Sequence, residues 1–178
     1  ICDGFKDFPF SLSCLYKSPK NLGSANLWTL NFEDKFSCMV GYSYDDYERW
    51  CSDYPYEKYC EQFELLLEKW QKGLQILEKI NNNKKISEIL TFAKGAYLHF
   101  EYDLIHTRYA YYKRDLSKYK IEFLQTLEKG RINAEETIKL IYKDSRFGFE
   151  ASNHYYYTVH NIIEKILNID VIKKQLSL

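Results

Sequence analysis

Residues 54–80, YPYEKYCEQFELLLEKWQKGLQILEKI, decide the fold class of this chain. Large apolar side chains recur there every three or four residues, which is the spacing of one face of an α-helix. The stripe comprises Phe63, Leu66, Leu67, Trp70, Leu74 and Leu77. Pro55 suits the first helical position and Glu57 the first turn, so we expect a helix from about Tyr54 to Ile80.

The same spacing continues towards the C-terminus. Further helices are predicted over 86–112 and 119–143, separated by polar breaks at 81–85 and 113–118. A shorter helix follows Thr158, which suits an N-cap. The three apolar stripes comprise Ile89, Leu90, Ala93, Tyr97, Phe100 and Leu104; Leu124, Leu127, Ala134, Ile138 and Ile141; and Val159, Ile162, Ile163, Ile166 and Leu167.

Long helices joined by short breaks favour an antiparallel arrangement. The predicted fold is therefore mainly α: a three-helix up-down-up bundle over 54–178 with a short C-terminal helix. Gly130 weakens the third helix by about 1 kcal/mol relative to Ala, which suggests a close helix crossing at that residue.

Residues 1–53 keep no helical period, because Pro9, Pro19 and Gly23 interrupt the apolar residues. We expect this irregular segment to wrap the bundle, so that 1–178 forms a single helical domain. The length of 178 residues is enough for one domain with its own core. Because the chain opens without Met or a signal-peptide pattern, we expect a fragment of a larger protein.

Composition argues against several classes of partner. Lys+Arg and Asp+Glu number 25 each, so a nucleic-acid binder is not indicated. No apolar run approaches the roughly 18 residues of a membrane span. The five cysteines are odd in number and form no CxxC, which favours reduced thiols in a cytoplasmic protein over zinc or a disulfide framework. No Gly-rich phosphate loop is present, and no cofactor is expected.

Residues 144–157, DSRFGFEASNHYYY, are the strongest candidate for a binding surface. Hydrogen-bonding side chains at Arg146, Glu150, Asn153 and His154 precede the run of tyrosines that begins at Tyr155. Polar groups beside aromatic faces suit a sugar or another polar ligand. The alternative is that these residues cap two helices and satisfy one another in a buried corner, with Arg146 and Glu150 forming an ion pair.

Two other groups of residues have more ordinary explanations. His99, Asp103 and His106 have the spacing of metal ligands on one helix. A helical projection puts them on the flank of the apolar stripe, so a solvated or partner-facing flank is predicted and no metal site. The aromatic run 109–112 is predicted to pack at a bundle end beneath the N-terminal segment.

Three stretches resemble the C-terminal region of large glycoside-hydrolase-like proteins of gut bacteria. They are 18–27 (SPKNLGSANL), 38–50 (CMVGYSYDDYERW, followed by Tyr54-Pro55) and 144–158; shorter similarities lie at 61–63 and 70–74. The chain departs from the pattern at Ser24 and Ser43, where proline is expected. The resemblance implies a catalytic barrel upstream, with this chain as the helical domain that follows it.

The implied function is a non-catalytic accessory domain that supports or completes the substrate cleft of the barrel. Its partners would be that barrel and a carbohydrate, in the cytoplasm of a bacterium. The predicted contact residues are Arg146, Glu150, Asn153, His154 and Tyr155, with Asp45, Asp46 and Trp50. Two alternatives stay open: a free-standing ligand- or protein-binding bundle, and a catalytic fragment that uses Glu150 with an Asp.

Overall fold

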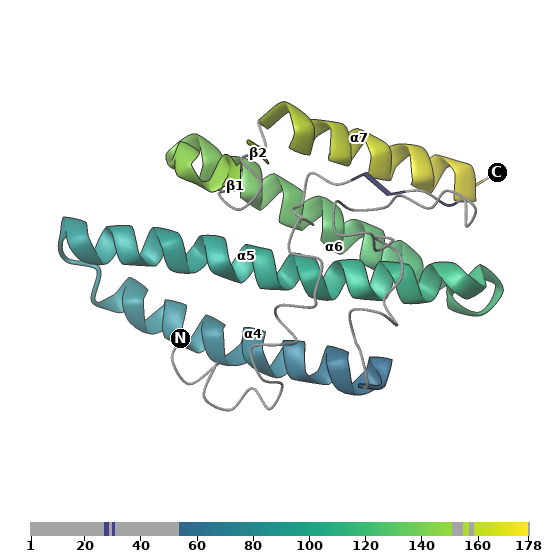
Figure 1. Ribbon diagram of the computed structural model, residues 1–178, viewed down its shortest axis with the longest axis horizontal. Coiled ribbons are helices and arrows are strands. Elements are labelled where there is room, and N and C mark those ends of the chain that lie inside the picture. The colour runs from purple at the N-terminus through teal and green to yellow at the C-terminus, as the bar shows by residue number, and fades with distance from the viewer. Residues whose placement is uncertain (1–26, 29, 31–53, 151–154, 157–158, 178) are drawn as a thin grey trace.

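The structure, a computed structural model, describes residues 27–28, 30, 54–150, 155–156 and 159–177. Its elements are α4 (Tyr56–Lys79), α5 (Lys84–Tyr112), the 3₁₀ turn η1 (Lys113–Asp115), α6 (Leu116–Lys143), the 3₁₀ turn η2 (Ser145–Gly148), β1 (Phe149–Glu150), β2 (Tyr155–Tyr156) and α7 (Val159–Leu176) (Figure 1). The predicted mainly α fold is confirmed. Most of the predicted irregular segment 1–53 lies outside the described residues.

Side-chain caps explain where two of the helices begin. The Asn83 side chain accepts a hydrogen bond from the backbone N–H of Ile86 at 3.1 Å, so α5 starts two residues earlier than its apolar pattern predicts. Asp115 does the same for the N–H of Lys118 at 3.2 Å. The start of α6 is bent at Tyr119, whose φ of −113° and ψ of 22° are not helical.

The helices lie side by side in chain order. In Figure 1, α4, α5, α6 and α7 follow one another across the molecule, and the main contacts join α4 to α5, α5 to α6 and α6 to α7. Ion pairs between Arg131 and Asp170 and between Lys173 and Glu128 connect α6 to α7. α5 therefore has neighbouring helices along two sides, which leaves further sides of it for another part of the chain to cover.

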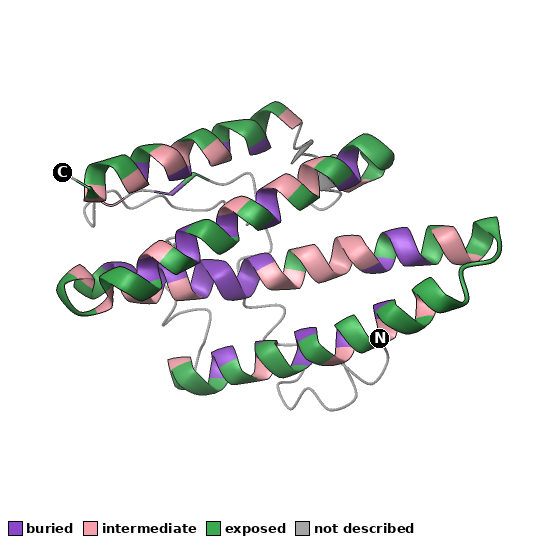
Figure 2. Cartoon of the chain, turned by 180° about the vertical axis from the view of Figure 1, so that it is seen from behind, coloured by how far each residue is buried: buried purple, intermediate pink, exposed green. Residues whose placement is uncertain are grey.

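The core is richest around the C-terminal half of α5. Residues 102–107, 109 and 110 are all buried there, which means that this half of α5 is covered on all sides (Figure 2). Trp70 of α4 donates its indole N–H to the carbonyl of Ala93 at 2.9 Å, which joins the α4 and α5 faces. Within the described ranges, every helix is too short or too polar to span a bilayer.

Trp28 reaches this core from the N-terminal segment. Its ring is buried and stacks on Tyr109 with centroids 4.3 Å apart and planes 8° apart. The prediction that the run 109–112 packs beneath the N-terminal segment is therefore confirmed for Tyr109, while Tyr111 stacks on Tyr56 of α4. A Cβ at Gly130 would lie 2.6 Å from the Trp28 ring and 3.6 Å from Ile169 of α7, so the close approach expected at this glycine involves an inserted indole as well as a helix.

The prediction of a solvated or partner-facing flank on α5 was wrong as to solvent for two of its three residues. Asp103 and His106 are buried, and only His99 of the three remains substantially exposed. The Trp28 indole N–H donates to Nδ1 of His106 at 3.0 Å, so a residue 78 positions away in the sequence contacts this flank. Periodicity within α5 carries no information about such a distant contact.

Candidate functional site

The candidate site is the end of the molecule where α6 turns back towards α7. α6 ends at Lys143, and the backbone N–H of Asp144 still donates to the carbonyl of Leu140 at 2.8 Å. The turn η2 follows, and β1 then pairs antiparallel with β2, Phe149 opposite Tyr156 and Glu150 opposite Tyr155. Four side chains form what we call the Arg146 corner. Asp144, Arg146 and Phe147 lie at the start of this connection, and Phe92 of α5 contacts the last two.

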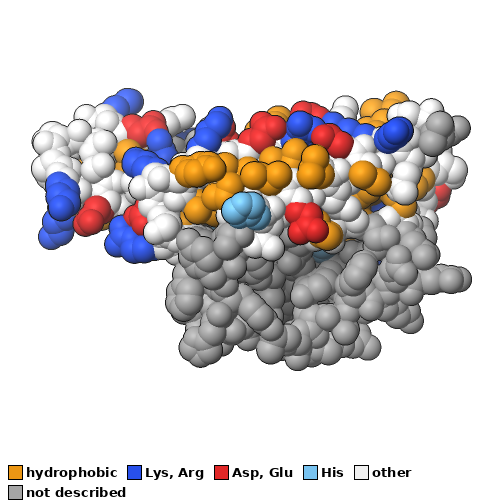
Figure 3. All heavy atoms as spheres, turned by 90° about the horizontal axis from the view of Figure 1, so that it is seen from above, with side chains coloured by type: hydrophobic (Ala, Val, Ile, Leu, Met, Phe, Trp, Pro, Cys, Tyr) orange, Lys and Arg blue, Asp and Glu red, His pale blue; other side chains and the backbone are white. Residues whose placement is uncertain are grey.

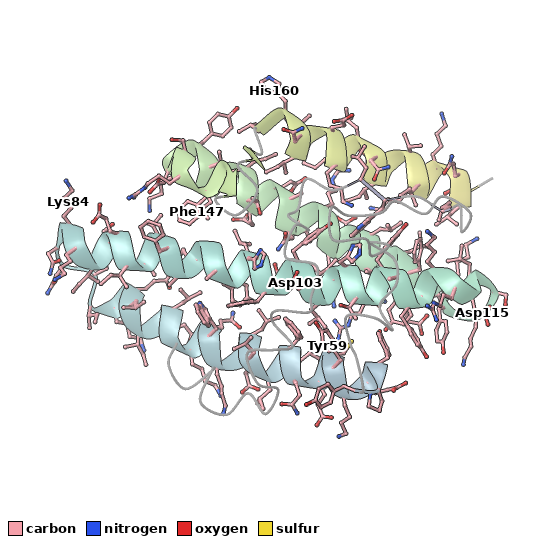
Figure 4. The ribbon with its side chains drawn as sticks, in the orientation of Figure 1. Tyr59, Lys84, Asp103, Asp115, Phe147 and His160 are labelled. Carbon is pink, nitrogen blue, oxygen red and sulfur yellow. The ribbon has the colours of Figure 1, made fainter. Side chains whose placement is uncertain are left out.

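Phe147 attaches the corner to α5. Its ring lies against Gly95, where an added Cβ would come within 2.3 Å of it, and its centroid is 5.3 Å from that of Phe92 (Figure 4). Glycine at position 95 therefore provides the space into which the phenylalanine ring fits. Because α5 is a long helix held on both sides, this contact gives the turn a fixed base.

Arg146 contacts Asp144 and Phe92 although its side chain faces solvent. Its Nε donates to both carboxylate oxygens of Asp144, at 2.8 and 3.0 Å, and Nη2 donates to Oδ2. The guanidinium carbon lies 4.7 Å from the centroid of the Phe92 ring. The side chain is nevertheless 58% exposed, and the Nη1 amino group takes part in none of these hydrogen bonds.

Asp144 and Arg146 each stabilise the charged form of the other. Hydrogen bonds from the Arg146 side chain lower the pKa of Asp144, and the Asp144 carboxylate in turn raises the pKa of Arg146. A carboxyl group with a lowered pKa stays ionised, so Asp144 is poorly suited to act as a general acid. What the corner offers a ligand is a positive, planar group with unused N–H donors beside an aromatic face.

The predicted site residues fall into three groups. Arg146 is described and exposed, although its guanidinium pairs with Asp144, whereas Glu150 was the expected partner. Glu150 and Tyr155 face each other as backbone partners in β1 and β2, and their side chains lie outside the described part. The remaining predicted contact residues, Asn153, His154, Asp45, Asp46 and Trp50, also lie outside the described residues.

Sequence reasoning missed two aromatic residues at this end of the molecule. Phe92 of α5 is 45% exposed and Tyr142, on the last turn of α6, is 77% exposed. Both are large aromatic residues that stand outside the apolar stripes of their helices. Their positions outside the apolar stripes could have identified them from the sequence, because an aromatic ring that is not on the core face of a helix is exposed to solvent or to a ligand.

Asp103 and His99 form a second polar group, in the middle of α5. Their carboxylate and imidazole are 3.7 Å apart, and burial raises the pKa of Asp103 to about 6, although nearby His99 acts in the opposite direction. Among the described residues, no three His, Cys, Asp or Glu side chains are grouped so that they could hold a metal ion. His106 is already engaged by the indole of Trp28.

Comparison with known proteins adds no relative. No model of a protein family matches this chain, and neither a curated protein nor a solved structure does.

Proposed function

We propose that this chain is a non-catalytic helical accessory domain of a glycoside-hydrolase-like protein. The Arg146 corner and the segments around it would contact the substrate or the catalytic barrel. The observation that carries the proposal is the exposed guanidinium of Arg146, fixed between Asp144 and the Phe92 ring. A group that is already ordered loses little conformational entropy when it binds, which favours a contact at this point.

The chemistry of the corner supports a binding role over a catalytic one. A glycosidase needs two carboxyl groups about 5–5.5 Å or about 6.5–9.5 Å apart, one of which can be protonated. Asp144 is committed to Arg146, and its lowered pKa keeps it ionised. An arginine stacked on an aromatic ring instead donates hydrogen bonds to hydroxyl or carboxylate oxygens, as recognition of a polar ligand or a protein surface requires.

The setting proposed for the domain is the cytoplasm of a bacterium, with the barrel on the same polypeptide. The free, buried thiol of Cys60 agrees with this setting. Burial raises its pKa to about 11, so the thiol stays protonated and unreactive.

A free-standing ligand- or protein-binding bundle is the second candidate. It is favoured by exposed apolar side chains on α7, where Ile163, Leu167 and Val171 recur every four residues. Hydrophobic side chains gather along the face shown in Figure 3. Such a stripe on a helix is a common feature of protein-binding surfaces.

Titration of the isotope-labelled full chain with a panel of neutral and acidic oligosaccharides, followed by NMR, tests the binding role. We expect the backbone amide signals of Phe92 and Phe147, the neighbours of Arg146 at the corner, to shift with at least one sugar. The Arg146→Met variant should lose this response, while Arg114→Met, at the opposite end of α5, should keep it. Equal responses in both variants would remove Arg146 from the site.

The sequence upstream of Ile1 separates the two candidates. A reading frame that continues into a barrel domain supports the accessory role, and hydrogen exchange should then slow at Phe92 and Arg146 in the longer protein. A stop codon directly before Ile1 would favour the free-standing bundle. Glycosidase turnover by this chain alone, lost in Glu150→Gln, would contradict the non-catalytic role.

A further inference from the structure

Trp28 occupies a site made by three helices, which we call the Trp28 cradle. Its members are His106 and Tyr109 of α5, Gly130 of α6, and Lys165 and Asn168 of α7. All of them are at least 78 residues from Trp28 in the sequence. The contact is therefore made by a segment that folds onto a distant part of the chain.

The cradle recognises the main chain at Trp28. The backbone N–H of Trp28 donates to Oδ1 of Asn168 at 2.8 Å, and Nδ2 of Asn168 donates to the carbonyl of Trp28 at 2.8 Å. One side-chain amide thus satisfies both backbone groups of a single residue. A neighbouring β-strand would hold the backbone through the same two kinds of hydrogen bond. The contact requires that the tryptophan be part of a peptide chain, because it uses both the N–H and the C=O of that residue.

The cradle also recognises the indole. The ring stacks on Tyr109, and its N–H donates to Nδ1 of His106 at 3.0 Å. Accepting at Nδ1 leaves the proton of a neutral His106 on Nε2. Phenylalanine has no N–H to donate here, and the hydroxyl of tyrosine would lie in a different place. The site therefore selects tryptophan by its donor as well as by its size.

Gly130 and Lys165 make two further contacts with the ring, at its outer edge and over its flat face. The missing side chain of Gly130 makes room for the ring edge, since a Cβ there would be 2.6 Å from Cη2. Nζ of the fully buried Lys165 lies 3.3 Å from the ring centroid. A desolvated cation over an indole is among the stronger cation–π arrangements.

The helices of the cradle are joined to one another by contacts that do not involve Trp28. Nδ2 of Asn133 on α6 donates to the carbonyl of Leu98 at 3.0 Å and to Glu101 at 2.8 Å, both on α5. Between α6 and α7, Arg131 pairs with Asp170. These contacts join α5 to α6 and α6 to α7 without passing through Trp28.

We propose that the Trp28 cradle is a binding site for a peptide segment centred on tryptophan, occupied here by Trp28 of the same chain. The main-chain clamp of Asn168 supplies affinity, and the indole pocket supplies specificity. A separate peptide of the same sequence binds the cradle when Trp28 does not fill it. The segment around Trp28 is then an internal ligand that blocks the site.

Calorimetric titration of the full-length Trp28→Ala chain tests this. The probe is the capped peptide Asn-Leu-Trp-Thr-Leu, the sequence of residues 26–30. We expect one peptide to bind per chain, and a peptide with Ala in place of Trp not to bind. Adding Asn168→Ala removes both main-chain hydrogen bonds and should weaken binding by about 10- to 30-fold. Asn161→Ala, elsewhere on α7, serves as the matched control.

A folding defect in Trp28→Ala would still be informative. Because a ligand that binds only the folded state stabilises it, the peptide should then restore the helical circular dichroism of the variant. Absence of binding to a folded Trp28→Ala chain, or no recovery of an unfolded one, would overturn the proposal.

Discussion

The indole of Trp28 occupies the space that Gly130 leaves by lacking a side chain. A Cβ at position 130 would lie 2.6 Å from Cη2 of Trp28. Replacing Gly130 with alanine therefore has two opposing effects. Helix propensity favours alanine by about 1 kcal/mol, whereas overpacking a filled site costs about 1–3 kcal/mol.

We expect the sign of the Gly130→Ala effect to depend on Trp28. With Trp28 present, the overpacking cost dominates and the free energy of unfolding should fall by up to about 2 kcal/mol. In a Trp28→Ala background the methyl group meets no ring, and the same change should raise it by about 1 kcal/mol. Urea unfolding followed by circular dichroism measures both. Equal effects in the two backgrounds would contradict the contact between these residues.

Removing the Trp28 ring should lower the free energy of unfolding far more than removing the side chain of the adjacent Leu27. Trp28 is buried, whereas Leu27 is 47% exposed. We expect Trp28→Ala to lower the free energy of unfolding by about 3–5 kcal/mol and Leu27→Ala by about 0.5 kcal/mol. Both values come from urea unfolding. Similar losses for the two variants would mean that the segment is held by something other than the indole.

Asp103 should make the protein more stable at acid pH than at neutral pH. Burial raises its pKa to about 6, and its Oδ1 accepts no hydrogen bond from any residue that the structure describes. The folded pKa lies above the unfolded value of about 3.9, so folding favours the protonated carboxyl. Its contribution is complete below about pH 4 and is lost as the pH rises through about 6, a difference of about 2–3 kcal/mol.

Asp103→Asn should remove most of this pH dependence and stabilise the protein at pH 7. Unfolding in urea at a series of pH values between 4 and 8 measures the slope. Asp170→Asn, at a carboxylate that is 45% exposed, is the control and should keep the slope. Some slope should remain in Asp103→Asn because burial also raises the pKa of Glu101. An unchanged profile would show that Asp103 is not the group responsible.

Arg146 should be dispensable for folding. Its side chain is 58% exposed, and exposed ion pairs contribute little to stability. We expect Arg146→Met to change Tm by no more than about 3 °C. Phe147→Ala removes a ring that fits against Gly95 and should lower Tm by more. If Arg146→Met unfolded the chain, its loss of ligand binding could not be assigned to the missing guanidinium.

The long helices could be predicted because their cause is local. In α4, for example, Phe63, Leu66 and Trp70 are spaced for one helix face, and all three are buried. α5 begins two residues before its predicted start and α6 three residues before, since Asn83 and Asp115 each cap the first turn with a side chain. At the candidate site the sequence drew attention to Arg146, whose side chain is exposed, but it identified neither its partner Asp144 nor the ring of Phe92.

The sequence by itself determined which segments are helical, because apolar spacing and breaks act within a few residues of each other. The tertiary structure alone decided what covers the free sides of those helices. Trp28 fits between Gly130, Tyr109 and Asn168, and this contact accompanies the burial of His106, on a flank that periodicity assigned to solvent or to a partner. Such a contact depends on shape and hydrogen-bond complementarity between distant segments, which no local pattern encodes.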